Sequence, residues 1–193
     1  MRRIIYRVIL LTLITATSLV GYLVHYHNLT EEIIVSEHID GEQANALKHT
    51  YAAAQLYELL TSILPDEAAE DMVVWLGHMN EYAEQWMRSY PKNRVAGTQP
   101  DTTIEIIKDL HNNRAGIAAA RWKLAHTPKD ITTLAMILRL VRMDAVVVWA
   151  NKLGIPKNEL DAHVRDVAFA NAWVEQRREK IAHHTQETLS KLY

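Results

Sequence analysis

The stretch Asp109-Leu110-His111-Asn112-Asn113-Arg114-Ala115-Gly116 places polar residues inside an apolar helical pattern. On a helix, with about 100° between successive residues, Asn113 falls on the apolar stripe made by Ile106, Leu110, Ile117 and Leu124. A buried asparagine needs hydrogen-bond partners, and a glycine inside a helix costs about 1 kcal/mol relative to alanine. Two interpretations stay open: a polar functional site, or a packing device in which an asparagine bridges two helices and a glycine lets them approach.

The rest of the chain predicts an all-α fold, because apolar residues recur every three or four positions and prolines separate the runs. After the N-terminal segment we expect a bundle of about five helices, at residues 42–64, 65–90, 102–126, 131–153 and 156 to near the C-terminus. Arg142 lies on an apolar stripe, so we predict that it pairs with a carboxylate inside the bundle. The polar stretch after Glu175 is expected to project or fray.

The N-terminus predicts a membrane anchor. Residues 8–24 are mostly apolar and carry no charge, and Arg2, Arg3 and Arg7 precede them. We therefore expect a single-pass signal-anchor within residues 1–27, a linker at 28–41, and a helical domain at 42–193. The positive-inside rule places that domain outside the cytoplasm, in the periplasm of a Gram-negative cell. A cleaved signal peptide, with Ala16-Thr17-Ser18 near the cleavage site, is the alternative.

Charge and composition narrow the function classes. A formal net charge of -2 argues against a nucleic-acid partner. The absence of cysteine excludes disulfides and thiol chemistry but does not indicate a compartment. The expected partners are the lipid bilayer, through residues 8–24, and a protein of an envelope or membrane complex.

Three polar elements recur along separate predicted helices: Asn45-Ala46-Leu47-Lys48-His49, then Gly77-His78 with Glu81, then residues 109–116. Together they resemble a family of bacterial helical domains of unknown function, with Asn-x-x-Arg-His, His-Glu and Asp-x-x-Asn-Asn-x-x-Gly-Arg elements. The chain departs from that pattern at Lys48, Met79 and Ile117. The resemblance implies a helical fold and brings no established reaction.

The candidate site residues come from these elements: His49, His78, Glu81, Asp109, Asn112 and Asn113. Histidine with carboxylates can bind a divalent metal or transfer protons, and the asparagines can orient a substrate. We expect the amide of Asn113 to reach another helix, with His49 as its first candidate partner. Two functions follow: an anchored non-catalytic subunit or interaction module, which ranks slightly ahead, and an anchored hydrolase-like or metal-binding domain with a His/Asp/Asn pocket.

Overall fold

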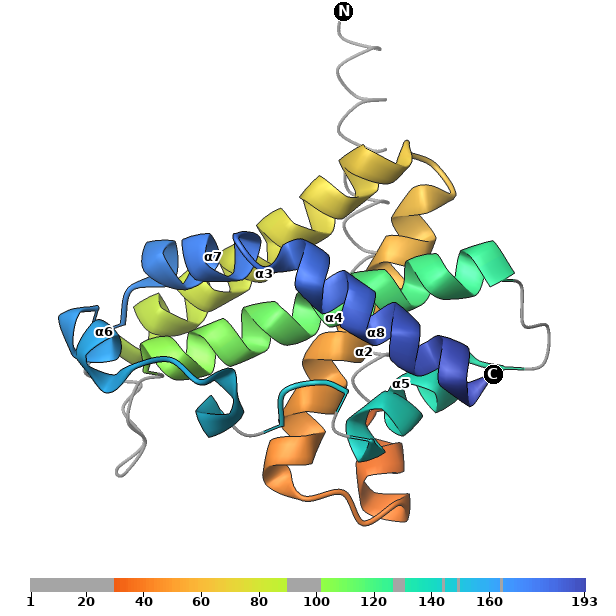
Figure 1. Ribbon diagram of the computed structural model, residues 1–193, viewed down its shortest axis with the longest axis horizontal. Coiled ribbons are helices and arrows are strands. Elements are labelled where there is room, and N and C mark those ends of the chain that lie inside the picture. The colour runs from red at the N-terminus through yellow and green to blue at the C-terminus, as the bar shows by residue number, and fades with distance from the viewer. Residues whose placement is uncertain (1–29, 90–101, 127–130, 144, 149, 164) are drawn as a thin grey trace, which may run out of the picture. The chain divides into compact units, whose positions relative to one another are not determined.

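The computed structural model describes residues 30–89, 102–126, 131–143, 145–148, 150–163 and 165–193 (Figure 1). Every regular element among these residues is a helix, which confirms the all-α fold. The chain divides into two units, Met1–Asp40 and Gly41–Tyr193, and the second unit is the helical domain. In the first unit, residues 30–36 form a short helix within the stretch that we expected to be a linker.

Three helices of the domain agree with the predicted ranges to within a few residues. They are α2 (Gly41–Thr61), α3 (Asp66–Ser89) and α4 (Thr103–His126). Proline-containing segments of the sequence separate the three, and proline lacks the N–H that a helix interior needs. Local signals were therefore sufficient to locate these helices.

The helix predicted at residues 131–153 is shorter and divided. The α5 helix (Thr133–Arg142) begins at the N-cap Thr132, whose hydroxyl accepts a hydrogen bond from the Ala135 amide at 3.1 Å. It ends at Arg142, and a 3₁₀ turn, η2 (Ala150–Leu153), follows the segment 145–148. Arg142 is exposed, so its predicted burial is wrong, because the apolar stripe used to place it assumed that the helix continued.

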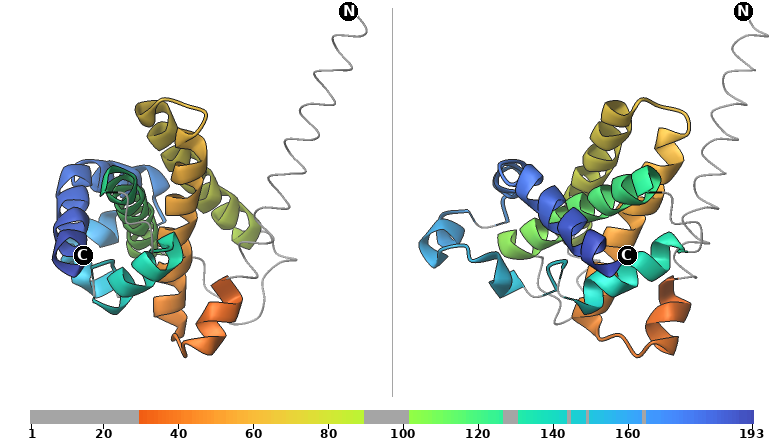
Figure 2. Two further views of the ribbon diagram at one scale, coloured as in Figure 1. Left: turned by 90° about the vertical axis from the view of Figure 1, so that its right-hand side faces the viewer. Right: turned by 45° about the vertical axis from the view of Figure 1, so that its right-hand side comes forward.

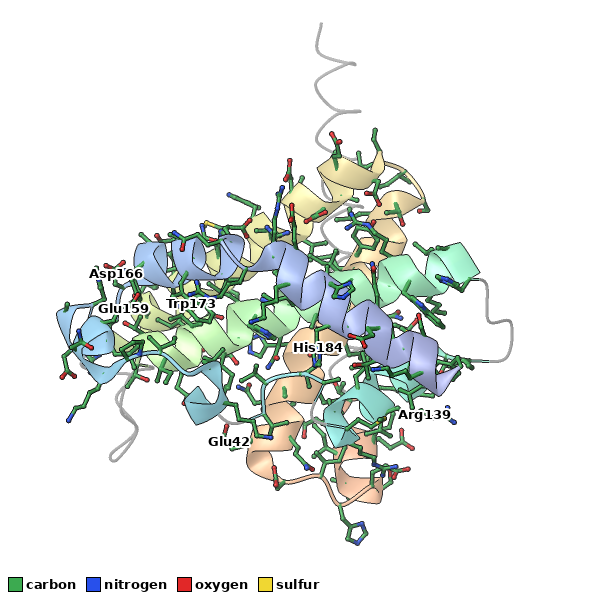
Figure 3. The ribbon with its side chains drawn as sticks, viewed as in Figure 1. Glu42, Arg139, Glu159, Asp166, Trp173 and His184 are labelled. Carbon is green, nitrogen blue, oxygen red and sulfur yellow. The ribbon has the colours of Figure 1, made fainter. Side chains whose placement is uncertain are left out.

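The expected last helix is divided into α6 (Lys157–Ala162), α7 (Val167–Glu175) and α8 (Arg178–Leu192). The backbone of Arg165, with φ of 57°, leaves the helical region before α7. Asp166 then caps α7 by accepting a hydrogen bond from the Phe169 amide at 2.9 Å (Figure 3). The bundle therefore contains more and shorter helices than predicted.

The predicted fraying after Glu175 is also wrong. The α8 helix packs along α4, and it buries Ile181, Thr185 and Leu189, which are four residues apart and share one face. This narrow stripe is sufficient to hold α8 against the domain, although most of the helix is polar.

The α4 helix runs through the middle of the domain, where α2, α3, α5, α7 and α8 all contact it (Figures 1 and 2). Ile106, Leu110 and Ile117 are buried as predicted, whereas Leu124 at the end of the stripe is exposed. Because α4 is surrounded, polar residues in its middle, such as Asp109, Asn112 and Asn113, lie in the interior of the domain.

No helix among the described residues has both the length and the apolar character that a membrane span requires. Residues 8–24, on which we predicted the anchor, lie outside the described part of the chain.

Candidate functional site

A histidine and two carboxylates from three different helices converge inside the domain. His49 lies on α2, Glu81 on α3 and Asp109 on α4, and one potential ligand atom of each lies within 4.8 Å of the others. Glu81 is 2% exposed and Asp109 is 7% exposed. The structure thus brings together three of the six candidate residues.

Asp109 is held between two side chains of α2. Nδ2 of Asn45 donates a hydrogen bond to Oδ1 of Asp109 at 2.9 Å, and Nε2 of His49 lies 3.5 Å from Oδ2. Asn45 and His49 are four residues apart, so they project from the same face of α2. The amide therefore fixes one carboxylate oxygen and leaves the other directed at the imidazole.

A close backbone approach holds α2 against α4 next to this group. A Cβ atom added to Gly116 would lie 2.1 Å from the carbonyl oxygen of Thr50 and 3.1 Å from Cβ of Ala53. Only glycine permits this contact, and Thr50 directly follows His49 in the chain. The packing interpretation of Gly116 is thus confirmed, and that packing positions the His49–Asp109 pair.

A buried cation lies next to the site in the sequence of α4. The buried Lys108 precedes Asp109, and its ammonium group is bonded to Glu42 at 2.9 Å and to Glu105. Burial disfavours the charged amine, but the hydrogen bonds that the ammonium donates to Glu105 and Glu42 outweigh this effect and raise the pKa of Lys108. Lys108 therefore forms ion pairs with two glutamates directly beside Asp109.

His78 and Asn113 lie in a separate small hollow between α3, α4 and α7, lined also by Leu110, Arg114 and Glu175. Burial lowers the pKa of His78, although the neighbouring Glu175 opposes this shift. The predicted burial of Asn113 is confirmed, at 9% exposed. The Asn113 amide contacts α3 at Gly77, where an added Cβ would lie 2.8 Å from Nδ2. His49, which we expected to be the partner of Asn113, lies beside Asp109 instead.

Asn112 has a structural role. Its Nδ2 donates to the carbonyl oxygen of Val147 at 2.8 Å, and its Oδ1 accepts from the amide of Val147 at 2.9 Å. Both backbone groups of one residue in the segment 145–148 are thereby satisfied by one fully buried side chain. The two adjacent asparagines therefore contact different parts of the domain: Asn112 binds the segment 145–148, and Asn113 contacts α3.

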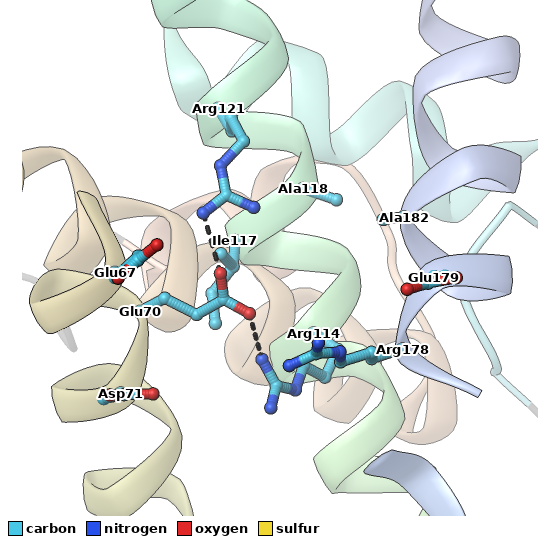
Figure 4. Close-up of a pocket in the computed structure, with 10 residues that line it drawn as sticks. All are labelled: Glu67, Glu70, Asp71, Arg114, Ile117, Ala118, Arg121, Arg178, Glu179 and Ala182. Carbon is cyan, nitrogen blue, oxygen red and sulfur yellow. Dashed lines mark hydrogen bonds and ion pairs between the residues drawn. The ribbon is translucent and has the colours of Figure 1, made fainter. Parts of the chain in front are cut away.

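A cleft of about 440 Å³ lies between α3, α4 and α8, and none of the six candidate site residues lines it (Figure 4). Glu70 bridges two arginines of α4 in this cleft, with Oε1 bonded to Arg114 and Oε2 2.7 Å from Arg121. Arg114 also pairs with Glu175, and Arg121 pairs with Asp66 at 2.7 Å. Because carboxylates already bind both α4 guanidinium groups, neither of these two arginines is available to an anion.

No family model matches this chain, and neither a curated protein nor a solved structure shows significant similarity to it. The resemblance to a bacterial helical family therefore stays a prediction. The site must be interpreted from its own chemistry, which is an imidazole nitrogen and two buried carboxylates around one point.

Proposed function

We propose that the helical domain binds a divalent cation with His49, Glu81 and Asp109, and that the predicted N-terminal anchor carries this domain at a membrane. The single observation that carries the cation site is the convergence of two buried carboxylates and an imidazole within 4.8 Å. Two like charges so close in a buried setting repel each other unless a proton or a cation lies between them. A divalent cation satisfies both carboxylates at once.

The donor set suits zinc, manganese or ferrous iron, which accept nitrogen and oxygen ligands together. Ligand atoms bound to one such ion at about 2.1 Å lie at most roughly 4.2 Å apart. The His49–Asp109 distance of 3.5 Å already meets this limit, and the wider separation in the group requires a contraction of less than about 1 Å. Asp109 would be a metal ligand, and the hydrogen bond from Asn45 would orient its carboxylate, as outer partners of metal ligands commonly do.

Three protein ligands leave coordination positions for water, and a bound divalent ion lowers the pKa of that water toward neutrality. This is the chemistry of metal-assisted hydrolysis, so the proposal corresponds to the metal-binding alternative drawn from the sequence. The other function drawn from the sequence, a non-catalytic interaction module, is favoured by exposed apolar side chains of α3 such as Trp75 and Trp86, which offer a surface to a protein partner.

Cation-dependent stability tests the proposal. The full chain is stripped with a chelator and its melting temperature is measured with Zn²⁺, Mn²⁺ or Mg²⁺ added. An ion at 100 times its Kd stabilises the fold by about 2.7 kcal/mol, which raises the melting temperature by roughly 5–11 °C. Asp109→Asn should abolish the rise while its oxygen still accepts the Asn45 hydrogen bond.

The exposed Asp161 of α6 supplies a matched control, because Asp161→Asn removes the same charge far from any ligand of the group. This variant should respond to the cation as the wild type does. The proposal fails if no divalent cation raises the melting temperature, or if the Asp109 variant responds as strongly as the control.

A further inference from the structure

A row of large apolar side chains lies exposed along the outer face of α3. The row, which we call the α3 stripe, consists of Met72, Trp75, Met79, Tyr82 and Trp86, which are between 42% and 63% exposed. The opposite face of α3 is buried through Ala69, Val73 and Glu81. In both views of Figure 2, α3 lies at the outside of the domain.

The spacing of the α3 stripe indicates what kind of surface covers it. Successive members are three, four, three and four residues apart, which is the heptad spacing of a helix that packs lengthwise on another helix. Five side chains about half exposed present on the order of 500 Å² of largely apolar surface. Contiguous patches of this size mark interaction sites. A second helix lying along α3 is therefore the occupant that fits.

The charges around the α3 stripe indicate which kind of partner helix can pack on it, and in which orientation. Exposed Glu67 and Asp71 precede the stripe, whereas the positions beside it, such as Leu76, Ala83 and Gln85, carry no charge. A neutral border offers no ion pairs that would select a strongly charged partner. Two α3 helices packed parallel would bring their acidic ends together. Packed antiparallel about Met79, the acidic ends lie about 25–35 Å apart, beyond the screening length of about 8 Å at physiological salt.

We propose that the α3 stripe is the interface between two copies of this chain, packed antiparallel about a two-fold axis near Met79. Such packing places the flexible Met79 near the axis. On either side of it, Trp86 of one copy lies opposite Met72 of the other, and Trp75 lies near Tyr82. The two stripes together bury about 1,000 Å², at the lower limit for a specific interface. The dimer therefore has modest affinity. It does not depend on the proposed cation site.

The test uses the absence of cysteine from the sequence, because a single introduced thiol is then the only one present. Three full-length variants are compared: Met79→Cys, Met72→Cys and, as a control on exposed Leu124 of α4, Leu124→Cys. Each is treated with a short bis-maleimide in isolated membranes, or in solution where the chain is not retained there. Circular dichroism checks that each variant folds.

Met79→Cys should give at least ten times more cross-linked dimer than either other variant, since residue 79 meets itself near the axis. Two copies of residue 72 lie about 20 Å apart in the antiparallel pair and stay unlinked. Mixing Met72→Cys with Trp86→Cys chains should restore the cross-link. Adding Trp86→Glu to the Met79→Cys chain should reduce its cross-linking at least ten-fold, because a charge would then be buried in the interface.

Three results would overturn the proposal. The first is the absence of a cross-link at residue 79. The second is equal cross-linking of residues 72 and 79, which would indicate parallel or non-specific association. The third is a reconstituted chain that does not cross-link at residue 79 and in which brominated lipids quench the fluorescence of Trp75 and Trp86. That result would identify a lipid surface as the occupant of the α3 stripe.

Discussion

Gly116→Ala tests the close contact that positions the candidate site. An added Cβ would lie 2.1 Å from the carbonyl oxygen of Thr50, and Cβ contacts shorter than 3.0 Å are essentially never observed. The helices α2 and α4 must therefore separate by roughly 1 Å, because the obstructing atom belongs to backbone and cannot rotate away. Overpacking of this kind costs about 3 kcal/mol, at the upper end of its usual range.

Alanine also recovers about 1 kcal/mol of helix propensity. The expected net loss is about 2 kcal/mol in the free energy of unfolding, which lowers the melting temperature by roughly 4–8 °C. Since α2 carries His49 and α4 carries Asp109, the same separation should weaken cation binding. Thermal and urea denaturation followed by circular dichroism measure the first effect, and cation titration measures the second.

Two other glycines serve as matched controls. An added Cβ at Gly41 meets nothing within 4 Å, so Gly41→Ala should leave the stability unchanged or slightly raise it. At Gly77 the obstructing atom is the side-chain Nδ2 of Asn113, at 2.8 Å, which can move, so Gly77→Ala should cost less than Gly116→Ala. If Gly116→Ala melts as the wild type does, the close approach of α2 and α4 is not a feature of the molecule.

Three further variants test separate parts of the interior. Asn112→Ala leaves both backbone groups of Val147 without their partner and should cost about 2–3 kcal/mol, with faster hydrogen exchange of the Val147 amide. Burial lowers the pKa of His111 to about 4, so the native state resists protonation and loses stability as the pH falls below 6.5. The loss between pH 7 and pH 5 is about 2 kcal/mol in urea denaturation, and His111→Leu should remove that part of it. Leu189 of α8 is fully buried, so Leu189→Ala should destabilise the fold by about 2–4 kcal/mol, whereas a projecting tail would show no effect.

The sequence was informative where structure depends on near neighbours. Proline-separated runs located α2, α3 and α4, and the 3.6-residue period placed Asn113 in the interior. The 3.6-residue period failed at Arg142 because it was extended beyond the end of α5, into residues 145–148 and 150–153, which do not continue this helix. It also failed in α8, where Ile181, Thr185 and Leu189 form a stripe too narrow to be recognised among polar residues.

The candidate site was predicted in part. Its residue types could be selected because histidine, carboxylates and asparagines recur on separate helices. Which of these side chains contact each other could not be predicted, because those contacts depend on how the helices cross. Asp109 meets His49 and Asn45, whereas Asn112 meets the backbone of Val147, although the two α4 residues are only three positions apart. Glu70 between two arginines had no sequence signal, because ion pairs between separate helices leave no local pattern.

The composition of α4 has a consequence for how the molecule folds. This central helix contains Asp109, His111, Asn112, Asn113 and Gly116, and each of these residues forms helix less readily than alanine does. A segment of this kind would be largely unfolded on its own, since isolated helices are marginal even with favourable residues. It becomes helical only as its neighbours dock, so α4 and the helices around it form in one cooperative step. The exposed α6, which buries none of its residues, can open separately, whereas the arrangement of His49, Glu81 and Asp109 exists only while α2, α3 and α4 are docked.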